Sequence, residues 1–359
     1  MNDNPLWNTP IQLRIGDPAS VTSNVPHLLG FYPQDSLVLV TVTAGDPPRL
    51  GVTVRIDLPP PQYYELTARS LLQPLIINDV VSATLVLVGS SRHDPNTPPG
   101  GWTEPSKDGL PHRSLVDALT AALADAEIDV VRAVWTPRIE TGQRWWCYED
   151  PSCTGELPDV RSTALAMASA VSGDVTLRDR DELVVMLEPV PSDTLRRTEA
   201  ALEARAHLAP NTNTAAAVQL FMDAMANTHE LTQPDGADHV ADLIAALRPP
   251  AVRTVCMGMA LDDRAHDAER LWIALTKATP GPWRAEPACL LAVSAYAQGK
   301  GVLARAAVDV ALDADPHHGL ASVLDQALRM GLPRRKVLAI LAETTTESAS
   351  GDARTDDVG

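Results

Sequence analysis

The residues that could do chemistry gather first in one short segment, Gly-Ser-Ser-Arg-His-Asp, at positions 89–94. This segment directly follows residues 83–88, an apolar run of strand length, and ligands of α/β proteins bind outside the carboxyl ends of strands. A glycine, two hydroxyls and a guanidinium can hold an anion, while a histidine and an aspartate can exchange protons. The candidate residues of a ligand-binding loop are therefore Ser90, Ser91, Arg92, His93 and Asp94. The alternative is that this segment only begins a long disordered loop, which runs to about His112.

Two more candidates, Asp35 and Ser36, lie in the stretch HLLGFYPQDSLVLV, residues 27–40. Gly30 is expected to end a helical turn by taking a positive φ, and Pro33 prevents the helix from continuing. Asp35 and Ser36 then either hydrogen-bond the local backbone before the first strand or line a site at the sheet edge. An enzyme would require Asp35 and the 89–94 loop to converge in one site, whereas an interaction module would not.

A second cluster combines tryptophan with arginine. Tryptophan and arginine are the residues that buried contact sites favour, because of their large area and their cation–π geometry. The alternative is that the tryptophans fill the core, since the chain has only two Phe. The candidates for an interaction surface are Trp102, Arg138, Arg144, Trp145 and Trp146.

Cys147 and Cys153 are close enough in sequence to reach one metal ion or each other. Zinc requires four ligands, and the other candidates are nearby carboxylates such as Glu149 and a distant histidine such as His112. Thiolates and carboxylates together make a weak zinc site. We therefore expect free thiols and no metal, with a reversible disulfide as the alternative.

Sequence motifs of several enzyme classes are absent from the chain. It contains no Gly-rich phosphate loop with Lys-Ser/Thr, no Gly-x-Gly-x-x-Gly, no Gly-x-Ser-x-Gly and no His-Glu-x-x-His. We accordingly predict no catalytic residue and no cofactor from sequence.

The charge of the chain limits its partners. It carries 46 acidic and 29 basic residues, for a net charge of -17. Such a chain repels the phosphates of nucleic acids and anionic membranes, so neither is an expected partner. The remaining candidates are a protein partner at the Trp/Arg cluster and a small anionic ligand at the 89–94 loop. No apolar run approaches the roughly 20 residues that a spanning helix needs, and a cytoplasmic location is expected.

The pattern of apolar residues predicts two kinds of structure. Strands are expected at 37–43, 50–58, 83–88 and 128–135, and helices at 63–77 and 114–126. This order indicates an α/β domain with a mixed sheet over residues 1–160. Residues 161–343 have mainly helical periodicity, although 181–187 fits strand or helix, and 285–316 resembles a tetratricopeptide-like hairpin. The acidic tail, 344–359, is expected to be disordered.

Three segments also carry a resemblance to a known family. Residues 27–40, the Trp-rich residues 144–159 and the helical residues 290–328 resemble a bacterial, actinobacterial-type family, domain of unknown function 4192. The resemblance spans roughly residues 10–333 and implies a shared fold without an activity.

These observations together favour a non-catalytic protein that acts by protein interaction or by sensing a small ligand. The alternative is a hydrolase or transferase that acts on an anionic small molecule at the 89–94 loop, with Asp35, His93 or Asp94 as acid or base.

Overall fold

A computed structural model describes residues 17–89, 109–150, 152–172, 174–209, 213–337 and 339. The chain forms two compact units, which meet in sequence between Arg180 and Asp181. This division lies further along the chain than the boundary at residue 160 that composition predicts. The predicted tail, residues 344–359, lies outside the described residues.

The first unit contains a six-stranded mixed sheet with the order β2-β1-β3-β4-β5-β6. β1 pairs antiparallel with both β2 and β3, β3 and β4 are parallel, and β5 and β6 return to antiparallel pairing. The predicted mixed sheet is therefore confirmed. The strands are β1 (Ser36–Thr43), β2 (Arg49–Asp57), β3 (Val80–Val88), β4 (Asp129–Thr136), β5 (Arg144–Cys147) and β6 (Thr154–Glu156).

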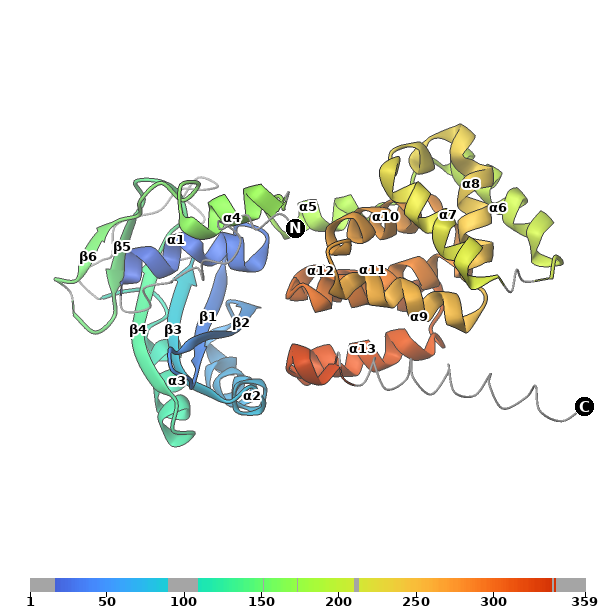
Figure 1. The fold of residues 1–359 in the computed structure, drawn as a ribbon. Coiled ribbons are helices and arrows are strands. Elements are labelled where there is room, and N and C mark those ends of the chain that lie inside the picture. The colour runs from blue at the N-terminus through green and yellow to red at the C-terminus, as the bar shows by residue number, and fades with distance from the viewer. Residues whose placement is uncertain are drawn as a thin grey trace, which may run out of the picture. The chain divides into compact units, whose positions relative to one another are not determined.

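Helices cover both faces of this sheet (Figure 1). The helices α2 (Tyr64–Ile77) and α3 (Arg113–Asp125) lie side by side on one face, with the 3-10 turn η2 (Pro61–Tyr63) before them. The helices α1 (Pro18–Leu29) and α4 (Ala164–Ser172) lie on the other face. Successive side chains of a strand point to opposite faces, so a strand covered on both sides reads as a continuous apolar run. The leucines that pack against α2 and α3 are Leu37, Leu39, Leu85 and Leu87.

The end of α1 has the predicted chemistry. Gly30 takes a φ of 83°, and its N–H donates to the carbonyl oxygen of Pro26 at 2.8 Å. The helix before it is 12 residues long rather than a single turn. His27 in its last turn bonds through its two ring nitrogens to Thr176 Oγ1 at 2.9 Å and to the carbonyl oxygen of Val160 at 2.8 Å. These bonds tie the chain beyond residue 160 to the first unit.

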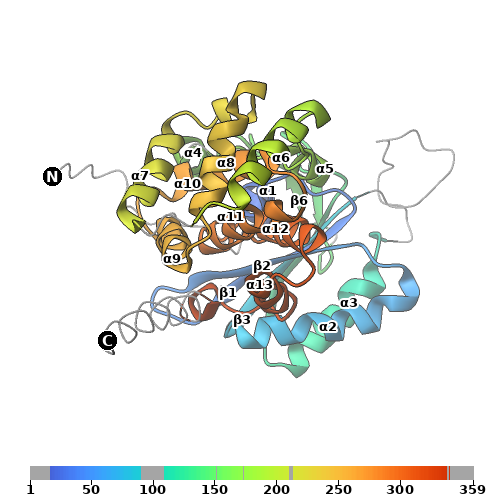
Figure 2. The same ribbon diagram turned by 90° about the vertical axis from the view of Figure 1, so that its right-hand side faces the viewer.

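The second unit is helical throughout its described residues (Figures 1 and 2). Its helices are α5 (Arg180–Met186, which begins at the boundary), α6 (Ser192–Ala206), α7 (Thr214–Ala226), α8 (Ala237–Ala246), α9 (Pro250–Gly258), α10 (Ala265–Ala278), α11 (Ala285–Ala297), α12 (Gly301–Ala314) and α13 (Gly319–Arg329). The 3-10 turns are η3 (Glu230–Thr232), η4 (Pro234–Gly236), η5 (Met259–Leu261) and η6 (Gly281–Arg284). The ambiguous segment 181–187 is thus helical.

The helix α11 is the core of the second unit. All but one of its residues are buried, and it packs lengthwise against α12. Both helices carry small buried side chains, among them Ala292, Ala304 and Ala311. The predicted helical region is confirmed, and its tetratricopeptide-like character stays a prediction. In the part of the chain that the structure describes, no helix has the length and apolar character needed to cross a membrane.

Candidate ligand site at the edge of the sheet

Five strand ends meet at one edge of the sheet. Ser36 at the start of β1 pairs with Val88 at the end of β3 and with Asp57 at the end of β2. Val88 in turn pairs with Thr136 at the end of β4, whose hydroxyl donates to the carbonyl oxygen of Arg144 at the start of β5. β1 therefore begins at the same edge of the sheet at which the parallel strands β3 and β4 end.

Asp35 lies directly against Gly89, the first residue of the predicted ligand loop. Both have positive φ, 39° at Asp35 and 141° at Gly89. A Cβ atom on Gly89 would stand 2.5 Å from Asp35 Oδ1 and 2.9 Å from Asp35 Cα, so only glycine fits here. Gly89 is held from the other side, because its carbonyl oxygen accepts a bond from Trp135 Nε1 at 3.1 Å. Ser90, Ser91, Arg92, His93 and Asp94 lie outside the described residues.

Ser36 and Asp35 have different surroundings. The Ser36 hydroxyl is buried, donates to the carbonyl oxygen of Gln34 at 2.5 Å and accepts from Arg55 Nε at 2.9 Å. Ser36 thus makes the local turn contacts that the first of its two alternatives predicts. The side chain of Asp35 is exposed, and no described residue hydrogen-bonds its carboxylate.

His112 brings an imidazole to the neighbourhood of Asp35. It takes left-handed backbone angles just before α3, and its carbonyl oxygen accepts the N–H groups of Leu115 and Val116. Its Nδ1 lies 2.9 Å from the hydroxyl oxygen of Tyr64 on α2, which leaves Nε2 without a partner among the described residues. Burial lowers the pKa of His112, and the negative charge of Asp35 opposes this effect only in part. The imidazole is therefore neutral at neutral pH.

Tyr148 contacts the residues immediately before and after His112. It is 2% exposed, and its hydroxyl donates to the carbonyl oxygen of Pro111 at 2.5 Å. Its own carbonyl oxygen accepts Nη2 of Arg113 at 2.5 Å, and the guanidinium carbon of Arg113 lies 5.3 Å from the ring centroid. Burial raises the pKa of both Tyr64 and Tyr148, so their hydroxyls keep their protons. The imidazole is held in place by bonds that need no ligand.

No sequence pattern marks Tyr64 or Tyr148 as a site residue, and His112 is considered from sequence only as a distant zinc ligand. The usable signal was topological, because the helix that follows a strand in an α/β layer starts at the edge where the strand ends. His112 is the last residue before α3 and therefore had to lie near the end of β3.

The tryptophan cluster divides between core and surface. Trp135 is fully buried, Trp145 is 8% exposed and Trp146 is half-buried. The ring centroids of Trp135 and Trp146 are 5.1 Å apart. The guanidinium carbon of Arg144 lies 5.4 Å from the ring centroid of Trp146. Arg138 is exposed beside Glu140, at 3.8 Å, and Trp102 lies outside the described residues. An interaction surface here stays a prediction that depends on Trp146 and the arginines.

Cys147 and Cys153 are free thiols on opposite arms of the β5–β6 hairpin. Burial and the neighbouring Cys153 thiol raise the pKa of Cys147 to about 12. Glu149, the nearest carboxylate in the predicted ligand set, accepts the backbone N–H of Ala133 at 2.7 Å. A metal ion binds thiolates, which burial disfavours at Cys147, so we assign no metal to this pair.

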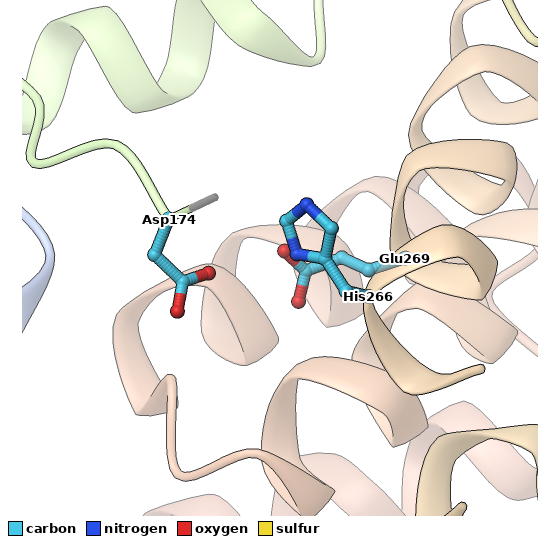
Figure 3. A group of neighbouring side chains, drawn as sticks. All are labelled: Asp174, His266 and Glu269. Atoms are coloured by element: carbon cyan, nitrogen blue, oxygen red, sulfur yellow. The ribbon is translucent and has the colours of Figure 1, made fainter. Parts of the chain in front are cut away.

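Among the described residues of the second unit, one carboxylate is buried. Glu269 on α10 is 6% exposed, and its Oε1 accepts from Lys300 Nζ at 2.7 Å. His266 lies one turn earlier on the same helix, with a ring nitrogen within 4.8 Å of a Glu269 oxygen (Figure 3). Asp174, also drawn there, belongs to the first unit. Within the second unit these two candidate ligands stand beside a lysine cation, so we assign no metal centre to them.

Comparison with known proteins gives a family and no activity. Residues 18–335 match the family described as "Domain of unknown function (DUF4192)". No curated protein and no solved structure matches the chain.

Proposed function

This chain belongs to the family of domain of unknown function 4192, and we propose that its first unit senses a polar small molecule at the carboxyl ends of β3 and β4. One observation supports the proposal: Asp35 lies against Gly89, the first residue of the 89–94 loop, and its charge acts on His112, which bonds Tyr64. Ligand sites of α/β sheets occur at this kind of edge.

The described groups favour a particular ligand chemistry. Asp35 offers a carboxylate that no described residue bonds, and His112 offers Nε2 of a neutral ring. A carboxylate accepts hydrogen bonds and repels anions, so the fitting ligand is a molecule with hydroxyl or amino groups. An anionic ligand would instead depend on Arg92, which lies outside the described residues.

The test is native mass spectrometry of the protein purified gently from its own host. We expect a retained small-molecule mass on the wild type, and its loss from Asp35→Asn and from His112→Gln. Asp129→Asn is the matched control, because Asp129 is also exposed but begins β4 at the opposite end of the strand. A bare wild type, or one mass retained by all four proteins, would contradict the proposal. A mass lost only from Arg92→Ala would favour the anionic ligand.

Catalysis in the same site is the second candidate, and the influence of the Asp35 charge on the His112 ring favours it. General-base action requires that Nδ1 carry the ring proton and donate it to the Tyr64 hydroxyl oxygen, which leaves the lone pair of Nε2 to accept a proton. The negative charge of Asp35 stabilises the resulting imidazolium. The reaction would be hydrolysis or group transfer, with His112 as general base. Incubation of the protein with the small molecule that it retains separates the two functions. Conversion by the wild type and not by His112→Gln supports catalysis, whereas an unchanged mass supports binding alone.

Protein interaction has less support than ligand binding. The burial of Trp145 leaves Trp146, Arg138 and Arg144 to form any contact surface in this region. A pulldown from native lysate with wild type and Trp146→Ala tests it, and equal recovery of a partner from both would remove this surface from consideration.

A further inference from the structure

Cys147 and Cys153 face each other across the β5–β6 hairpin. The strand register ends with Trp146 opposite Thr154, and continuing it by one residue toward the turn places Cys147 opposite Cys153. The backbone N–H of Cys147 donates to the carbonyl oxygen of Cys153 at 2.9 Å, and the two thiols are themselves hydrogen-bonded. Directly opposite residues of antiparallel strands have Cα atoms about 4.5 to 5.5 Å apart. A disulfide spans Cα separations of roughly 4.4 to 6.8 Å, so this pair can close with little backbone movement.

We propose that Cys147 and Cys153 form a peroxide-sensitive thiol pair that closes to a disulfide between the arms of the hairpin. The two residues differ in access to solvent: Cys153 is half-buried and Cys147 is 2% exposed. This difference divides their roles. Peroxide reaches Cys153 first, and Cys147 is the resolving thiol.

The chemistry balances with hydrogen peroxide as the oxidant. The Cys153 thiolate attacks one peroxide oxygen, the O–O bond breaks, and the released hydroxide takes a proton to become water. The Cys147 sulfur then attacks the sulfur of the Cys153 sulfenic acid and the S–O bond breaks. The leaving hydroxide removes the Cys147 thiol proton as a second water. Two thiols lose two electrons and two protons in total, and one peroxide becomes two waters. A dithiol reductant reverses the step by thiol–disulfide exchange.

The Cys147–Cys153 pair is connected through Tyr148 to the candidate ligand site. Tyr148 follows Cys147 in the chain, and its contacts with Pro111 and Arg113 hold the residues on either side of His112. Formation of the disulfide would therefore change the Tyr148 contacts that hold the His112 ring in place. This consequence depends on the proposed ligand site, whereas formation of the disulfide does not.

The experiment uses the full chain treated with hydrogen peroxide, followed by intact-mass measurement and peptide mapping. We expect the loss of two hydrogens, one cross-linked peptide that joins Cys147 to Cys153, and full reversal by dithiothreitol. The Cys256→Ser/Cys289→Ser variant is the control, because both of these thiols are buried in the second unit and should not affect the cross-link. Cys147→Ser should stop at a Cys153 sulfenic acid that dimedone traps.

The wild-type map decides the proposal even if Cys147→Ser does not fold. A wild type that accumulates oxygen adducts on Cys153 without the cross-link would overturn it. So would oxidation of Cys256 or Cys289 before the hairpin pair. Ligand retention is measured separately, so loss of the ligand proposal leaves the disulfide result standing.

Discussion

The hydroxyl oxygen of Tyr64 and Nδ1 of His112 lie 2.9 Å apart, although 48 positions separate the two residues. Their rings meet edge to face, with centroids 6.4 Å apart. The bond joins the first turn of α2 to the residue that precedes α3. It therefore fixes the orientation of the imidazole and leaves Nε2 as the ring atom available to a ligand.

Tyr64→Phe should destabilise the first unit, because it removes the partner of a half-buried ring nitrogen. A typical intramolecular hydrogen bond contributes about 1 kcal/mol, and we expect a loss of that size in urea-induced unfolding. Tyr63→Phe is the control, since Tyr63 is the neighbouring tyrosine in sequence and its side chain is 50% exposed. Equal changes in the two variants would contradict a specific role for the Tyr64 hydroxyl.

The pKa of His112 should be lower than the ordinary histidine value of 6.5, because burial disfavours the charged ring. Asp35→Asn should lower this pKa further, since the Asp35 charge favours the imidazolium. NMR titration of the His112 ring measures both effects. A midpoint at or above the ordinary value, or a rise in Asp35→Asn, would show that the environment of the ring is different.

The same shift makes stability depend on pH. The unfolded state binds the His112 proton more tightly than the folded state, so folding is disfavoured where the unfolded ring is charged. The contribution of neutral His112 is complete above about pH 6.5 and is lost as the pH falls from there toward the folded pKa. In the wild type, the free energy of unfolding should decrease as the pH is lowered through that window. His112→Gln should lack this component, and an equally steep fall in the variant would exclude His112 as its source.

The sheet could be predicted from sequence because both of its faces are covered. Burial on two sides makes β1, β3 and the second half of β4 mostly apolar, so they stand out without any knowledge of the fold. β5 and β6 are four and three residues long and consist of Arg-Trp-Trp-Cys and Thr-Gly-Glu. Segments so short carry no period, and they are strands only because β4 offers them an edge to pair with.

The candidate site was predictable only in part. Asp35 could be selected because it stands among turn residues that precede the first strand. Tyr64 and Tyr148 could not, because they reach the 111–112 segment only when α2, α3 and β5 have packed around the sheet. Their contacts with it cross 48 and 37 positions of the chain, distances over which sequence patterns carry no signal.

Gly89→Ala should destabilise the first unit by about 2 kcal/mol or more, because it combines a strained backbone conformation with a collision. The new Cβ would stand 2.9 Å from Asp35 Cα, which cannot move without shifting the entry to β1. Gly109→Ala separates the two effects, since Gly109 also has a positive φ, 101°, but nothing within 4 Å of its would-be Cβ. Thermal unfolding of both variants measures the difference, and a smaller loss in Gly89→Ala would refute the close contact with Asp35.

Lys300→Met should strongly destabilise the second unit, because it leaves the Glu269 carboxylate buried without its counter-charge. Glu269 Oε2 already lacks a partner among the described residues, so Lys300 is the main support of the charge. Breaking a buried pair by removing one partner costs about 3 kcal/mol or more. Glu269→Leu/Lys300→Met removes both charges and should recover much of that loss.

A surface pair on the same helix provides the control for this prediction. Arg270 and Asp267 on α10 bond at 2.9 Å with about half of each side chain exposed, at 53% and 52%. Solvent screens such a pair, so Arg270→Met should cost less than about 1 kcal/mol. Urea unfolding of the four proteins completes the comparison. Losses of similar size in Lys300→Met and Arg270→Met would mean that Glu269 is hydrated in solution and that its pairing with Lys300 contributes little to the stability of the helical unit.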